Sequence, residues 1–105
     1  MPTYTRAQAE ALLPKVRPLL EDLQRRVASY RRRPTGPVAR EIEALVREIA
    51  ELGVEVKDPD RGLIDFPTKM RGREVYLCWQ LGDGERISFW HDLETGFAGR
   101  RIIED

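Results

Sequence analysis

Residues 56–101 read VKDPDRGLIDFPTKMRGREVYLCWQLGDGERISFWHDLETGFAGRR, and this stretch decides the fold. It contains the single His and the single Cys of the chain, both Trp and all three Phe. Short apolar and aromatic runs alternate in it with Asp, Gly and Pro, which is the pattern of strands joined by turns. The stretch therefore predicts a β module, and the residues before it predict a helical support.

Turn residues divide this module into strands. Val54 and Val56 alternate with charged residues, as in a half-buried strand, and Asp58–Gly62 has the chemistry of a turn. The next strand is expected to end at Pro67, because proline has no N–H to donate to a sheet. The remaining strands are predicted over residues 63–66, 73–81, 86–91 and 101–103. We expect an antiparallel sheet of four to five strands.

Asp83-Gly84 lies between two of these strands and is a strong signal for a two-residue hairpin turn. Such a turn places Tyr76 opposite His91, with Cys78 diagonal to His91 on the same face. That face is predicted to carry Tyr76, Cys78, Gln80, Ile87, Phe89 and His91. The opposite face is predicted to carry Leu77, Trp79, Leu81, Ser88 and Trp90. Both faces are largely apolar, so we expect both to be covered.

The first 53 residues predict two antiparallel helices. Thr5 and Gln8 have the spacing of a capping box, the segment Arg33–Pro37 separates the helices, and Gly53 suits the end of the second. Apolar residues recur at alternating steps of three and four, as in a coiled-coil seam. The predicted pairs are Tyr30 with Val38, Val27 with Ile42, Leu23 with Leu45, Leu20 with Ile49 and Val16 with Leu52.

Some apolar residues lie outside this seam. Leu12 and Leu13 have no partner on the shorter second helix, so we expect them to pack on the β module. Val46 and Ala50 lie off the seam, and a second hairpin would cover them in a four-helix bundle. We therefore expect a homodimer through the hairpin. The alternative is that the β module alone covers this surface.

Length and composition indicate a single α+β domain, with the helical hairpin in residues 1–53 and the β module in 54–105. Residues 1–52 carry ten Lys and Arg against seven Asp and Glu, whereas residues 53–105 carry eight against eleven. A general nucleic-acid binder is expected to be basic throughout, so this class is disfavoured. A single Cys excludes an internal disulfide, and no signal peptide or membrane span is recognisable. We expect a cytoplasmic protein, and the absence of Asn fits a thermophilic source.

A series of short motifs resembles one family over nearly the whole chain. The motifs are Leu12-Leu13-Pro14, Lys57-Asp58, Gly62-Leu63, Asp65-Phe66-Pro67, Gly72-Arg73, Leu77-Cys78-Trp79, Trp90-His91 and Gly96-Phe97-Ala98-Gly99-Arg100. They are similar to those of the small bacterial proteins known as the domain of unknown function 2203 family. Gly82-Asp83 departs mildly from the Gly-Glu of that family. The resemblance implies membership but supplies no mechanism.

His91 is the first candidate for chemistry, because a neutral imidazole is a common metal ligand. With Asp58, Asp65 and Cys78 it has the ligand types of a mixed metal site, although the spacing matches no standard motif. The alternative is a His that is hydrogen-bonded at a strand end. A buried Cys on a strand is usually a small apolar residue, and a Cys–His nucleophile is the weaker interpretation of Cys78.

Three further residues are candidates for ligand contacts. Trp79 and Trp90 share a predicted face and offer a stacking platform for a ring ligand, although such pairs are more often core. Arg100 follows a glycine-rich loop that can present N–H groups to an anion. The arginines at the hairpin tip are a possible nucleic-acid contact or a solvated helix end; they are Arg25, Arg26, Arg31, Arg32, Arg33 and Arg40.

These features favour a non-enzymatic binding or interaction module that acts through the face around His91, Asp65 and Arg100. The residues proposed for ligand binding are Asp58, Asp65, Trp79, Trp90, His91 and Arg100. The first alternative is a metal-binding protein or metal-dependent hydrolase that uses His91 with Asp58, Asp65 or Cys78 and a divalent metal as cofactor. The second is a nucleic-acid contact through the arginine-rich tip.

Overall fold

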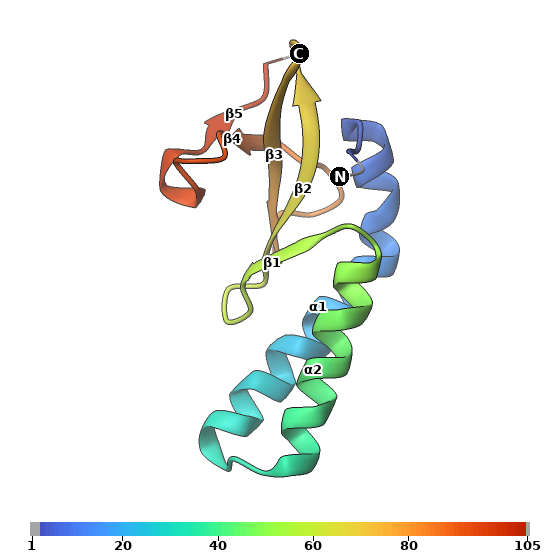
Figure 1. Ribbon diagram of the computed structural model, residues 1–105, viewed down its shortest axis with the longest axis vertical. Coiled ribbons are helices and arrows are strands. Elements are labelled where there is room, and N and C mark those ends of the chain that lie inside the picture. The colour runs from blue at the N-terminus through green and yellow to red at the C-terminus, as the bar shows by residue number, and fades with distance from the viewer. Residues whose placement is uncertain (1–2, 105) are drawn as a thin grey trace.

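The computed structural model describes residues 3–104 and has the predicted α+β architecture (Figure 1). Two helices, α1 (Arg6–Arg32) and α2 (Gly36–Glu51), form a hairpin. Five strands follow in one antiparallel sheet. They are β1 (Glu55–Asp58), β2 (Leu63–Met70), β3 (Arg73–Gln80), β4 (Phe89–His91) and β5 (Arg101–Ile102). Each strand pairs with the next one along the chain, so the sheet is a meander.

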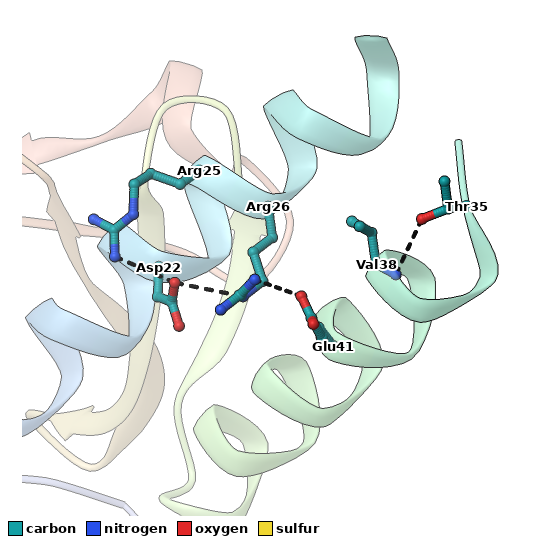
Figure 2. A network of polar contacts seen from close by, with 6 residues as sticks. All are labelled: Asp22, Arg25, Arg26, Thr35, Val38 and Glu41. Carbon is teal, nitrogen blue, oxygen red and sulfur yellow. Dashed lines mark hydrogen bonds and ion pairs between the residues drawn. The ribbon is translucent and has the colours of Figure 1, made fainter. Parts of the chain in front are cut away.

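Side-chain caps fix where both helices begin. Thr5 Oγ1 accepts from the Gln8 backbone N–H at 3.1 Å, and the Gln8 side chain accepts from the Thr5 N–H at 2.9 Å, which is the predicted capping box. At the start of α2, Thr35 Oγ1 accepts from the Val38 N–H at 3.4 Å (Figure 2). Gly53 has a φ of +79° just beyond α2, as the predicted C-terminal cap requires.

The seam between the helices is buried in its middle and open at its tip. Leu20, Leu23 and Ile49, which lie on the predicted seam, are completely buried. Tyr30 near the tip is 38% exposed, and Val46 on the outer side of α2 is 42% exposed. The first turns of α1 leave the hairpin and run beside the sheet (Figure 1), where Leu13 joins the common core as expected.

Three of the six arginines at the tip form ion pairs with acids of the same chain. Figure 2 shows Arg25 and Arg26 of α1 both reaching Asp22, and Arg26 also pairing with Glu41 of α2. Arg31 forms an ion pair of 2.6 Å with Asp60 of the β1–β2 turn. These contacts tie the two helices and the sheet together. They also lower the free positive charge that a nucleic-acid contact would use.

Strand β2 is longer than predicted, because it continues through Pro67 to Met70. The carbonyl of Pro67 accepts from the Tyr4 N–H at 2.7 Å, on the side of the strand away from β3. Since the N–H and C=O of one strand residue point to the same side, the missing N–H of Pro67 also lies on the Tyr4 side. The ladder between β2 and β3 therefore loses no hydrogen bond at the proline.

The pairing of β3 with β4 has the predicted register, but the turn between them differs. Tyr76 lies opposite His91, and Cys78 lies opposite Phe89. Residues 81–88 form a wide connection, so Asp83-Gly84 is not a two-residue hairpin turn and no strand begins at residue 86. Near its end the connection bonds to α1, where Ile87 N–H donates to Glu10 Oε2 at 2.7 Å. Ile87 consequently lies in the core with Leu77 and Trp79, not on the predicted face with Cys78.

The core lies between the helices and one face of the sheet. Its sheet residues include Ile64, Phe66, Leu77 and Trp79, which are all buried. Because side chains alternate along a strand, the residues between them face the opposite side. That opposite side carries Asp65, Cys78 and His91, and the segment 92–100 lies over it. No helix within residues 3–104 is long and apolar enough to cross a membrane.

Candidate metal site

Three neighbouring strands each contribute one buried polar or sulfur-bearing side chain to the same face. Asp65 of β2 lies directly opposite Cys78 of β3, and His91 of β4 lies two residues beyond Phe89, the residue that pairs with Cys78. One ligand atom from each of these three side chains lies within 4.8 Å of the other two. Asp65 is 1% exposed and His91 is 3% exposed. We call this group the Asp65–Cys78–His91 cluster.

The hydrogen bonds of His91 fix the tautomer of its ring. Nδ1 lies 2.7 Å from the backbone carbonyl oxygen of Asp92, which can only accept, so Nδ1 carries a hydrogen and donates it. Nε2 lies 2.8 Å from Asp65 Oδ2. A second proton must therefore lie between Nε2 and the carboxylate, either on the ring or on Asp65. In the absence of that proton, Nε2 presents a lone pair toward Asp65, as in metal-binding histidines whose Nδ1–H is held by a carbonyl.

Asp65 has one carboxylate oxygen without a hydrogen-bond partner. Within residues 3–104, Oδ1 is completely buried and accepts no hydrogen bond, whereas Oδ2 contacts His91. Burial raises the pKa of Asp65, and the hydrogen bond and charge of His91 only partly oppose this effect. An unpaired buried carboxylate oxygen is unfavourable, and a cation is one partner that would satisfy it.

Cys78 completes the cluster as a buried thiol. Burial, together with the nearby Asp65 carboxylate, raises the pKa of Cys78 to about 12. Without a cation the sulfur therefore keeps its proton at neutral pH, and it is a poor nucleophile. A bound metal ion reverses this situation, because coordination to a divalent cation removes the proton from a thiol. The same burial that makes Cys78 inert as a nucleophile leaves it suitable as a metal ligand.

A small pocket leads to the cluster. Its volume is about 160 Å³, and Asp65 and His91 both line it. The remaining lining residues are Lys57, Leu63, Tyr76, Leu93, Gly96 and Phe97. A ligand or a water molecule in this pocket could reach an ion held by the cluster, so the three protein ligands would leave a coordination position open.

A hydrogen-bonded network lies at the rim of this pocket. Tyr76 O–H donates to Glu55 Oε2 at 2.8 Å, and Lys57 Nζ donates to Glu55 Oε1 at 2.8 Å. Burial raises the pKa of Glu55, but the bonds from Lys57 and Tyr76 outweigh it and hold that pKa below its usual value. The Tyr76 ring lies 5.3 Å from the His91 ring, so this network packs directly on the cluster. Sequence reasoning did not identify it, because the register of β1 against β2 was not predicted.

The structure separates the other candidate residues from the cluster. Asp58 caps the β1–β2 turn, where its Oδ1 accepts from the N–H groups of Asp60 and Arg61. Trp79 is buried in the core on the other face, and Trp90 lies on that face near the sheet edge. The Arg100 guanidinium stacks on Phe97 and Phe89, 4.2 and 4.3 Å from the ring centroids, so it lies near the pocket but outside its lining.

The molecule is thus an α+β protein with a helical hairpin on one face of a five-stranded meander and a buried Asp–Cys–His cluster on the other. A family model described as "Uncharacterized conserved protein (DUF2203)" matches residues 31–103, and the chain belongs to this family. This finding confirms the resemblance in the motifs of the β module. Neither a search of curated proteins nor a search of solved structures found a match.

Proposed function

We propose that this protein is a metal-binding module in which Asp65, Cys78 and His91 hold one divalent transition-metal ion, with zinc as the best fit. The observation that carries the proposal is the approach of the three ligand atoms to within 4.8 Å around a buried carboxylate oxygen that has no partner within residues 3–104. Zinc accepts mixed Cys, His and carboxylate ligands, whereas magnesium and calcium select oxygen ligands alone.

Charge balance supports this proposal. A divalent cation bound by one thiolate, one carboxylate and one neutral imidazole has no net charge, and a neutral group is the least costly to bury. The ion would replace two protons, one on Cys78 and one between Asp65 and His91. The net charge of the buried cluster is therefore low both with the two protons and with the ion.

The proposal favours binding over catalysis. A metal-dependent hydrolase needs a general base in the pocket in addition to the metal-bound water. Among the described residues, Asp65 is the one carboxylate that lines the pocket, and Glu55 at its rim has both oxygens already bonded, one to Lys57 and one to Tyr76. We therefore infer that the open position accepts a ligand without turning it over, as the non-enzymatic interpretation of the sequence expects.

A zinc titration against a chromophoric chelator tests the proposal. The wild-type protein is expected to bind one zinc ion per chain. Asp65→Asn is expected to weaken zinc by about 10-fold to 100-fold or more, because it removes an anionic ligand. Asp58→Asn is the matched control, since Asp58 lies in a turn away from the cluster, and it should bind as the wild type does. Equal zinc affinity of both variants would refute the assignment.

Homodimerisation through the hairpin remains a second proposal. The observation that favours it is the exposure of Val46 on the outer side of α2, beside apolar residues of the helix seam. Light scattering of the purified protein at several concentrations measures the mass directly. A mass of two chains that Val46→Glu reduces to one chain would support the proposal, and a monomer at all concentrations would contradict it.

A further inference from the structure

A second hollow region lies on the face of the sheet opposite to the metal site, and Trp90 forms its centre. Two adjoining hollows with volumes of about 330 and 390 Å³ share Met70, Arg71 and Trp90. The first also includes Arg73 and Val75, and the second includes residues 101–104. We call the combined region the Trp90 groove. Each half reaches the lower end of the range of roughly 300–1,000 Å³ that is typical of small-ligand pockets.

Three arginines line the groove with Trp90, and one of them lies over its ring. The Arg101 guanidinium carbon lies 5.4 Å from the centroid of the Trp90 ring, a cation–π contact. Within residues 3–104, neither Arg71 nor Arg101 forms an ion pair, whereas Arg73 pairs with Asp92. Glu104 is the one acid that lines the groove among these residues. The groove therefore keeps positive charge in a chain whose sheet half is acidic overall.

The backbone at Arg71 is a second, independent observation. Arg71 and Gly72 form the two-residue turn between β2 and β3, and their φ angles are +53° and +78°. Both positions of such a turn favour Gly, Asn or Asp, and an arginine at positive φ is uncommon. Residues that are not glycine and have sparsely populated φ and ψ angles occur preferentially at functional sites. Residues 101–104 lie beside this turn, because they line the second hollow together with Met70 and Arg71.

We propose that the Trp90 groove binds a nucleotide, with Arg71 and Arg101 holding the phosphate and the base stacking against the Trp90–Arg101 pair. Arginine guanidinium groups bind phosphate oxygens in pairs of hydrogen bonds, and they also stack on flat rings. Tryptophan offers the largest aromatic surface for stacking. The same chemistry is presented by a free mononucleotide and by one unit of a single-stranded nucleic acid.

The groove is separate from the proposed metal site, although adjacent residues of β4 contribute to both. Trp90 and His91 follow each other in β4, so their side chains point to opposite faces of the sheet. Nucleotide binding can therefore be measured with a chelator present, and its outcome does not depend on whether the Asp65–Cys78–His91 cluster binds a metal.

Isothermal titration with AMP, GMP, CMP and UMP, each up to about 1 mM and with chelator present, tests the proposal. At least one of them is expected to bind with a ratio of one per chain, and Arg71→Gly is expected to weaken it about tenfold or more. Arg71→Gly also removes the unfavourable φ, so the variant should be as stable as the wild type and loss of binding cannot be due to unfolding. Lys69→Ala is the matched control, because Lys69 is an exposed cation on β2 outside the groove.

A short single-stranded RNA, tested with the same variants, identifies the source of the nucleotide. Binding of the RNA but not of a mononucleotide, with the same loss in Arg71→Gly, would support the proposal and assign the groove to single strands. No saturable binding of any mononucleotide or of the RNA would overturn it. Binding that Arg71→Gly and Arg101→Ala leave unchanged would also overturn it, because the ligand would then lie elsewhere.

Discussion

Replacement of His91 by alanine in the metal-free protein is the perturbation whose result follows most directly from the structure. The substitution removes the partner of Asp65 Oδ2, and Oδ1 already has none within residues 3–104. Asp65 is then a buried carboxylate that keeps only the weak hydrogen bond from the Cys78 thiol. Breaking a buried pair by removal of one partner costs about 3–5 kcal/mol. We expect the free energy of unfolding to fall by about 3 kcal/mol, at the low end of this range, because Asp65 can take up a proton instead of remaining charged.

The loss should depend on pH with a defined sign. Burial raises the pKa of Asp65 above its usual value, and His91 lowers it, so removal of His91 raises it further. An acid with a raised pKa in the folded state favours folding when it is protonated. That contribution is complete below its unfolded pKa of about 4 and is lost as the pH rises through the folded pKa. The deficit of His91→Ala relative to the wild type should therefore grow as the pH rises above about 4.

Urea unfolding with a chelator present measures both effects. A domain of this length has a free energy of unfolding of about 5–15 kcal/mol, so the variant should remain folded in water. The control compares the double variant Asp65→Asn/His91→Ala with Asp65→Asn alone, because neither carries a charge at residue 65 and the pH dependence due to Asp65 should disappear from their difference. A loss below about 1 kcal/mol in His91→Ala that is the same at all pH values would refute the reasoning.

Three other substitutions test the fold. Gly62→Ala should lower the free energy of unfolding in urea by more than about 1 kcal/mol, because Gly62 has a φ of +64° and an added Cβ would lie 2.4 Å from Leu81 Cδ1. Addition of Leu81→Ala to this variant should recover part of the lost stability. The absence of any recovery would contradict this steric explanation. Thr5→Ala should lower the thermal midpoint through the loss of about 1 kcal/mol of capping energy, and an unchanged midpoint would show that the cap contributes nothing. Arg26→Ala should change the free energy of unfolding by less than about 1 kcal/mol, because its ion pair with Glu41 is exposed to solvent; a larger loss would show that this pair holds the hairpin together.

Local chemistry predicted most of the fold. The capping box at Thr5, the turn at residues 33–37 and the apolar seam of the hairpin depend on residues that are close in sequence or repeat at a helical period. The β3–β4 register was also correct, although it was predicted from a two-residue turn at Asp83-Gly84 that the structure does not contain.

The predictions that were wrong depend on contacts with residues that are distant in sequence. Pro67 was expected to end a strand, but Tyr4 occupies the side of the strand where its N–H would be needed. Ile87 was assigned to the wrong face, because Glu10 and Arg6 hold its backbone against α1. Neither α1 residue carries a sequence signal for this contact, which depends on the placement of the helix on the sheet.

The sequence predicted which types of residue form the candidate site, and it predicted some of the particular residues. Asp65, Cys78 and His91 were named as ligands from their chemistry, and the structure brings them together. Asp58 was named for the same reason, but its carboxylate is used by its own turn, as is common for Asp at the start of a turn. Side-chain type indicates what a residue can bind, whereas the strand order decides which residues can share one ion.

The central claim is that Asp65, Cys78 and His91 hold one metal ion together. Absorption spectroscopy with Co²⁺ tests it most directly, because a cobalt–thiolate bond produces a charge-transfer band that oxygen and nitrogen ligands do not. We predict that the band saturates at one Co²⁺ per chain, that zinc removes it, and that Cys78→Ser abolishes it while the protein remains folded. Absence of the band in the folded wild-type protein, or its persistence in Cys78→Ser, would contradict the account.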